Sequence, residues 1–166
     1  SIAYKSIPPH NLFIVCDGIG GSRSGEVASS MVCKDLLDYI PRNINESNTL
    51  SDKLIQEVQD HTLSNLNYYT EQNPSSRQMG TTLTLAYLQS YSIKIAWCGD
   101  SRIYHIRDGK ILYQSTDHSL VNQLIREGAL TNDGAANFSQ KNVMTRVLQA
   151  NTHKSQIETY ELKDIE

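Results

Sequence analysis

Asp17 and the glycines that follow it are the residues whose types and spacing could most directly do chemistry. Residues 17–21 read DGIGG and come directly after the apolar run LFIVC at residues 12–16. A carboxylate at the end of a buried strand can bind a metal ion, and bare glycines let a ligand approach the main chain. Asp-Gly is also a strong hairpin-turn signal. On these residues alone, a structural turn and a ligand site are equally good interpretations.

The same glycines do not match a nucleotide-binding loop. Gly20 and Gly25 have the spacing of a Walker A motif, but Glu26 and Val27 stand where that motif requires Lys and then Ser or Thr. Arg23 occupies the third glycine position of the dinucleotide-binding pattern G-x-G-x-x-G. Both mismatches argue against a nucleotide site.

Two further acidic segments could contribute to a site. Residues 99–102 read GDSR, which places Asp100 after a strand pattern that ends at Cys98, and residues 116–119 read TDHS before a short helical pattern. Each also has an ordinary interpretation. The first could be a tight turn with its arginine as a solvated cation, and the second could be a helix N-cap. A histidine at the start of a helix is more often exposed, so His118 is expected on the surface.

Helical patterns occur on both sides of these motifs. Apolar residues at three- to four-residue spacing predict a helix over residues 26–40, with Pro41 following its end. A second helix is predicted from about residue 49 to residue 73, with Thr49 and Asp52 as a capping box. The remaining predictions are a helix over 120–127 that ends at Gly128, a surface loop over 131–142, and either strand or helix over 143–148.

Strand patterns fill most of the remaining sequence, and Asp108-Gly109 predicts a two-residue hairpin turn between two of them. The predicted strands are residues 11–16, 81–88, 92–98, 102–107, 110–114 and 157–162. Helices that are segregated from an antiparallel meander indicate an α+β fold.

Composition limits the class of protein. The chain has 166 residues and a net charge of −3, which argues against nucleic-acid binding through a basic surface. No apolar stretch reaches membrane-spanning length, so no membrane association is expected. The three cysteines, Cys16, Cys33 and Cys98, form no C-x-x-C pair. Buried free thiols would suit a reducing, cytoplasmic setting.

Taken in order, these motifs resemble those of the metal-dependent Ser/Thr protein phosphatases of the PPM (type 2C) family, particularly its bacterial branch. Residues 12–21 are similar to the family's strand and DGxGG motif, residues 79–82 (MGTT) to its G-T-T strand entry, and residues 95–104 to its GDSR strand pair. Other matching segments are residues 24–29, at the first long helix, and residues 116–121 and 142–148, which bracket the family's flap. The resemblance covers residue 11 to about residue 150 and implies an αββα sandwich.

The resemblance also implies a centre with two divalent cations, Mn²⁺ or Mg²⁺, and a third, weaker site. The aspartate that bridges the two cations falls on Asp17, and the glycine whose carbonyl binds one of them falls on Gly18. The aspartate that helps to hold the further cation falls on Asp100. Hard cations prefer such oxygen ligands, and two of them can activate a shared water for in-line attack on phosphorus. Ile19 stands where eukaryotic members often have histidine, so no general acid is assigned there.

The implied function is hydrolysis of phosphoserine or phosphothreonine in proteins. The partner would be a phosphorylated protein, with a Ser/Thr kinase opposing the reaction. Residues 1–166 would form a single, partial catalytic domain, and residues 118–142 would form its flap.

Some family features have no match in the sequence. An acidic motif should precede the strand at Leu12, and two aspartates should follow the last strand, where Asp164 is not a convincing substitute. The domain is therefore expected to be incomplete at both ends, without its N-terminal strand and its C-terminal strands and helices. We expect little activity from these residues alone. The alternative is a non-catalytic, phosphatase-like binding or regulatory domain.

Overall fold

The computed structural model describes residues 2–7, 10–19, 23–44, 47–140, 143–152 and 156–163, with residues 2–7, 10 and 23 described by their backbone only. Gly20, Gly21, Asn142 and Asp164, which the sequence analysis considered, lie outside these ranges. No helix in the described ranges is long and apolar enough to cross a membrane.

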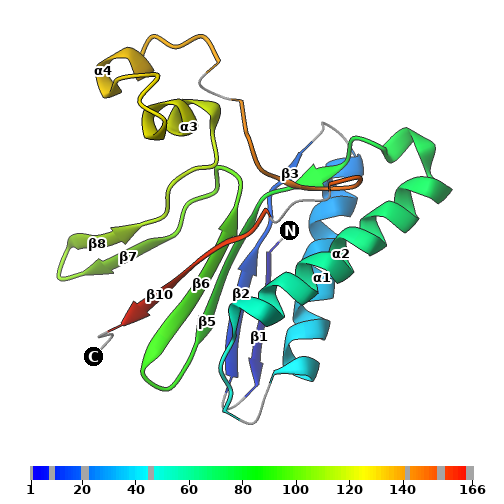
Figure 1. Cartoon of the computed structure of the whole chain (residues 1–166). Helices are drawn as coiled ribbons and strands as arrows, with labels where there is room; N and C mark the ends of the chain where they lie inside the picture. Colours follow the sequence, from blue (N-terminus) through cyan, green and yellow to red (C-terminus); the bar gives the residue numbers. More distant parts are fainter. Residues whose placement is uncertain are drawn as a thin grey trace.

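A five-stranded antiparallel sheet forms the centre of the fold (Figure 1). Its order is β1 (Ile2–Ile7), β2 (His10–Val15), β5 (Leu83–Leu88), β6 (Ser92–Cys98) and β10 (Glu158–Lys163). The strands predicted at 11–16, 92–98 and 157–162 are therefore confirmed to within a residue or two.

β1 was not predicted, and the N-terminal strand that was expected to be missing is present. Every residue of β1 pairs with β2, from Ile2 opposite Val15 to Ile7 opposite His10. β1 lies at the edge of the sheet, where backbone pairing with one neighbour defines a strand without a strong apolar pattern in its sequence.

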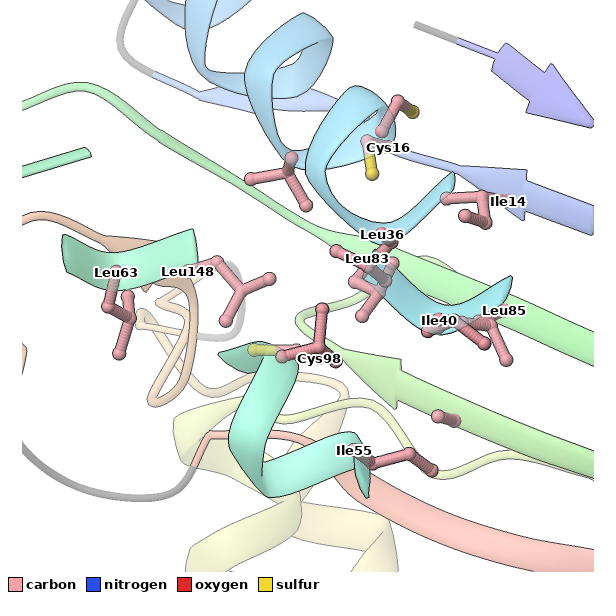
Figure 2. Close-up of a cluster of buried hydrophobic side chains, with 14 of the residues drawn as sticks. Ile14, Cys16, Leu36, Ile40, Ile55, Leu63, Leu83, Leu85, Cys98 and Leu148 are labelled. Carbon is pink, nitrogen blue, oxygen red and sulfur yellow. The ribbon is translucent and has the colours of Figure 1, made fainter. Parts of the chain in front are cut away.

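Two long helices, α1 (Arg23–Asn43) and α2 (Asp52–Gln72), cover one face of this sheet (Figure 1). Alternate residues of β2 and β5 point toward them, because successive side chains in a strand face opposite sides. The resulting core is shown in Figure 2 and includes Ile14, Cys16, Leu36, Ile40, Ile55, Leu63, Leu83, Leu85, Cys98 and Leu148.

The helix boundaries differ from the predicted ones at three points. α1 begins three residues earlier than predicted and continues through Pro41, which lies inside the helix instead of after it. The N-cap of α2 is Ser51, whose Oγ accepts the N–H of Leu54, so the predicted capping box at Thr49 and Asp52 is wrong. Ser51 provides the same capping chemistry two residues later.

A second, small sheet brings together three segments that are far apart in the sequence. It consists of β3 (Gly18–Ile19), β4 (Gly80–Thr81) and β9 (Leu148–Gln149), with β4 in the middle. A short 3₁₀ helix, η1 (Pro74–Ser76), leads from α2 toward β4. The strand predicted at 81–88 is thus two strands, β4 and β5, that are interrupted at Thr82.

The hairpin β7 (Tyr104–Arg107) and β8 (Lys110–Gln114) stands beside the main sheet (Figure 1). Asp108 and Gly109 have φ angles of +50° and +71°, which confirms the predicted two-residue turn. Across from the helices, Ile95, Trp97 and Leu162 form a smaller buried cluster.

Two short helices, α3 (Leu120–Arg126) and α4 (Asn132–Ala135), project beyond the end of the sheet (Figure 1). Gly128 has a φ of +73° and follows α3, as predicted. The segment predicted as a loop at 131–142 contains α4, a single turn that is capped by Thr131. The mixed helix and sheet composition of the described ranges confirms the α+β class.

Candidate functional site

Asp17 lies between β2 and β3, with an exposed side chain. Its backbone N–H donates to Thr82 Oγ1 at 3.1 Å, and its carbonyl accepts from Thr81 Oγ1 and from the Thr82 N–H, both at 2.9 Å. Thr81 and Thr82 belong to the G-T-T segment that the sequence analysis singled out. These bonds fix the main chain of Asp17, and none of them uses its carboxylate, which forms no hydrogen bond or ion pair within the described ranges.

Gly18 lies against the first turn of α1 in a contact that only glycine permits. A Cβ on Gly18 would lie 2.0 Å from the carbonyl oxygen of Gly25, and a Cβ on Gly25 would lie 2.9 Å from the Gly18 carbonyl carbon. Gly18 also pairs with Thr81 of β4. Gly18, the residue after Asp17, is therefore held between helix α1 and strand β4. This fixed position favours a ligand site over an isolated hairpin turn.

The turn at residues 99–102 contains Asp100, which is also exposed. Gly99 has a φ of +101°, and a Cβ there would lie 2.7 Å from Thr82 Cγ2, so both conformation and space require glycine. Ser101 Oγ lies 2.8 Å from Thr82 Oγ1. Thr82 therefore contacts the backbone of Asp17 and both neighbours of Asp100 in the sequence.

His118 is buried, with a side chain only 1% exposed, so the expectation of a surface residue was wrong. Its Nδ1 accepts the Gly99 N–H at 3.2 Å, and its Nε2 lies 2.9 Å from Glu158 Oε2. The neutral ring with hydrogen on Nε2 satisfies both contacts. Burial is the largest influence on the ring and lowers its pKa, while the hydrogen bond to Glu158 acts in the opposite direction. Both partners of His118 are distant in sequence, so its position could not be inferred from local pattern.

Arg102 is paired with Asp117 and is not a free solvated cation. Its Nε and Nη2 bond the two carboxylate oxygens of Asp117 at 2.7 and 2.6 Å, and Nη1 lies 3.5 Å from Tyr104 Oη. This paired geometry raises the pKa of the guanidinium. The pair ties the turn at residues 99–102 to the segment that leads into α3, where Ser119 is the N-cap.

The three cysteines all lie in the described ranges, are buried and form no disulfide. Contact with the Cys33 thiol, followed by burial, raises the pKa of Cys16 well above its ordinary value. Burial raises the pKa of Cys98 to about 12. These raised pKa values keep the Cys16 and Cys98 thiols protonated at neutral pH, whereas contact with the Cys16 thiol lowers the pKa of Cys33.

The donors at Asp17 and Gly18 fit a hard divalent cation in kind but not in number. A carboxylate and a backbone carbonyl are oxygen ligands, but such a cation takes about six or more. Within the described ranges, no three His, Cys, Asp or Glu side chains are grouped so that they could hold a metal ion. Asp17 and Asp100 thus provide part of a metal centre at most.

Sequence comparison defines the class of protein to which this fold and site belong. The family model for Protein phosphatase 2C matches residues 2–147. The chain belongs to this family, in agreement with the resemblance seen in its motifs.

The particular relatives are bacterial. The serine/threonine phosphatase stp of Listeria monocytogenes is 35% identical over 142 residues, which are 82% of this chain and 55% of the relative. The crystal structure of the serine/threonine phosphatase Stp1 from Staphylococcus aureus aligns with a TM-score of 0.79 and 27% identity, covering 99% of this chain and 65% of that one. The catalytic domain of the phosphatase PstP, solved with two manganese ions, aligns at 0.72 and 27%, covering 98% and 66%. The chain thus spans about half the length of the curated relatives it matches.

Proposed function

We propose that the chain is part of the catalytic domain of a metal-dependent protein phosphatase that hydrolyses phosphoserine and phosphothreonine in proteins. The observation that carries this proposal is the setting of Asp17. Its carboxylate is exposed, its backbone is bonded on both sides, and the glycine after it packs against Gly25. Relatives named serine/threonine phosphatases support the substrate class.

In this proposal, the Asp17 carboxylate and the Gly18 carbonyl are ligands of divalent cations, Mn²⁺ or Mg²⁺. Such cations polarise phosphoryl oxygens and lower the pKa of a bound water. The protein's part is to hold the Asp17 backbone still, so that its carboxylate needs no reordering to bind. Asp100 would serve a third, weaker cation site. A working centre also needs oxygen donors from outside the described ranges, because the described residues do not supply enough.

Three further assignments belong to the same proposal. Residues 118–142 form the flap that shapes substrate entry, and the projection of α3 and α4 beyond the sheet supports this. The partner is a phosphorylated protein whose Ser/Thr kinase opposes the reaction. The setting is cytoplasmic, a proposal supported by three buried cysteines of the described ranges that form no disulfide.

The decisive experiment is a calorimetric titration of the chain with Mn²⁺. Asp17→Asn should weaken Mn²⁺ binding by at least about tenfold, since it replaces an anionic ligand with a neutral one. Asp60→Asn is the matched control, because Asp60 is an exposed residue on α2 whose Oδ1 accepts a hydrogen bond from Gln56. Both variants should unfold at the wild-type urea midpoint. Equal Mn²⁺ binding by wild type and Asp17→Asn would refute the assignment.

A phosphatase assay separates the remaining possibilities. We expect these residues alone to release phosphate slowly from a phosphothreonine peptide with Mn²⁺, because the described donor set is incomplete. Rapid release would contradict that expectation. Phosphopeptide binding without Mn²⁺ binding would favour the alternative of a non-catalytic binding or regulatory domain.

A further inference from the structure

Thr82 occupies the break between β4 and β5 and is 1% exposed. Its side chain contacts both loops that carry the candidate acidic residues. The hydroxyl Oγ1 accepts the Asp17 N–H at 3.1 Å and lies 2.8 Å from Ser101 Oγ. A hydroxyl has one proton and two lone pairs, so one oxygen can serve both partners at once.

The methyl group of Thr82 lies beside Gly99, in the same turn as Ser101. Thr82 Cγ2 lies where it would be 2.7 Å from a Cβ on residue 99, and Gly99 leaves that space open. The residues immediately before and after Asp100 therefore both face Thr82. The hydroxyl contacts Ser101, and the methyl faces Gly99.

The Gly99 N–H has a separate acceptor, His118 Nδ1, at 3.2 Å. This bond does not involve Thr82. The exchange of the Gly99 amide therefore reports whether a change at Thr82 is transmitted through the turn or stays local.

We propose that Thr82 is a positioning residue that couples the backbone of Asp17 to the turn that carries Asp100. Its hydroxyl makes the two loops one hydrogen-bonded unit, so the two carboxylates are held relative to each other and not independently. The inference deepens the proposed function and rests on it for the role of those carboxylates. The coupling itself is a property of the protein backbone and is measured without a metal.

The test compares two substitutions of Thr82 with one matched control. Thr82→Val keeps the shape and the methyl group but removes the hydroxyl, while Thr82→Ser keeps the hydroxyl and removes the methyl. Thr84→Val is the control, because Thr84 lies two residues further along, in β5, and its hydroxyl donates to the Val15 carbonyl at 3.2 Å. Thr82→Val and Thr84→Val each replace a hydroxyl with a methyl group, whereas Thr82→Ser removes a methyl group.

Hydrogen exchange measured by NMR is the first readout. Thr82→Val should speed the exchange of the Asp17 amide and also that of the Gly99 amide, the latter by at least about fivefold, because local opening frees both loops. Thr82→Ser should keep the Gly99 rate near that of wild type, and Thr84→Val should change neither. Faster exchange at Asp17 alone would show that Thr82 only satisfies a local N–H group, which would overturn the proposal.

Mn²⁺ affinity is the second readout. Thr82→Val should bind Mn²⁺ at least about fivefold more weakly than Thr82→Ser, since displaced ligands bind less well. If wild type binds no Mn²⁺, the assignment of Asp17 and Gly18 as cation ligands in this chain fails, but the exchange data still decide the coupling. If Thr82→Val does not fold, Ser101→Ala replaces it. That variant removes only the Ser101 hydroxyl that contacts Thr82 and should speed exchange at the Asp17 amide. An unchanged Asp17 exchange rate would refute the coupling.

Discussion

Gly25→Ala is the substitution that most directly tests the packing of the Asp17 loop against α1. In an ordinary helix, replacing glycine with alanine stabilises a protein by about 0.5–1 kcal/mol. Here a Cβ on Gly25 would lie 2.9 Å from the Gly18 carbonyl carbon and from the Ile19 carbonyl oxygen. These are backbone atoms, so no side-chain rotation can relieve the contact. The structure therefore predicts a change of the opposite sign.

The size of the effect follows from the two opposing contributions. Overpacking of a well-packed site costs about 1–3 kcal/mol, and contact with backbone places Gly25 in the upper part of that range. Subtracting the gain in helix propensity leaves a net destabilisation of about 1–2 kcal/mol. Gly18→Ala should cost more, because its Cβ would lie only 2.0 Å from the Gly25 carbonyl oxygen. In a chain of this size, about 1 kcal/mol lowers the melting temperature by about 2–4 °C.

The assay is urea unfolding monitored by circular dichroism, with Ser30→Ala as the control. Ser30 is exposed on α1, and its replacement by alanine changes helix propensity without new contacts. The expected order of stability is Ser30→Ala, then Gly25→Ala, then Gly18→Ala. If Gly25→Ala is as stable as Ser30→Ala or more stable, α1 and β3 do not pack as described, and the reasoning about the Asp17 loop is wrong.

Three further predictions concern the buried and paired groups of the site. Burial lowers the pKa of His118 below its ordinary 6.5, so the unfolded chain binds the proton more readily than the folded chain. The free energy of unfolding should therefore fall as pH decreases through and below about 6.5. Urea unfolding at several pH values should show this fall, and His118→Gln should make the pH dependence weaker. Arg102→Lys should cost about 0.5–1 kcal/mol through loss of the paired contact with Asp117, and urea unfolding in about 1 M NaCl should show a smaller cost. Cys98, with a pKa of about 12, should resist iodoacetamide at neutral pH in the native chain and react in urea, so rapid native labelling would contradict its burial.

The elements with a strong local signal were predictable from the sequence. Periodic apolar residues located both long helices, and Asp108-Gly109 located the hairpin turn with its positive φ angles. The errors occur where tertiary contacts decide the outcome. Pro41 is tolerated inside the last turns of α1, and β1 forms through pairing with β2. Neither feature leaves a clear periodic signal in the sequence.

The sequence singled out candidate site residues, which remain predictions, but it did not predict the contacts between the segments that carry them. Asp17, Gly18 and Asp100 were identified from motif order, which carries information about which segments meet. The bond between Thr82 and Ser101 spans 19 residues, and that between Asp17 and Thr82 spans 65. His118 was expected on the surface because a helix start is usually exposed, whereas its environment comes from Gly99 and Glu158. The order of motifs suggested that these segments meet, and only the fold shows how.

Each of the two exposed acids, Asp17 and Asp100, has a neighbouring glycine that permits a close backbone contact. Gly18 allows β3 to touch α1, and Gly99 allows the next turn to touch Thr82. Each glycine carries a conformational cost of about 0.5–1 kcal/mol relative to alanine in regular structure. Yet Asp17 and Asp100, which follow and adjoin these contacts, are exposed and form no hydrogen bond or ion pair through their carboxylates within the described ranges. The constrained backbone on both sides of Asp17 and Asp100 supports the proposal that these two acids bind a ligand. A structural turn at residues 17–18 would not require the close approach of Gly18 to Gly25, so the proposed ligand site accounts for this contact better than a turn does.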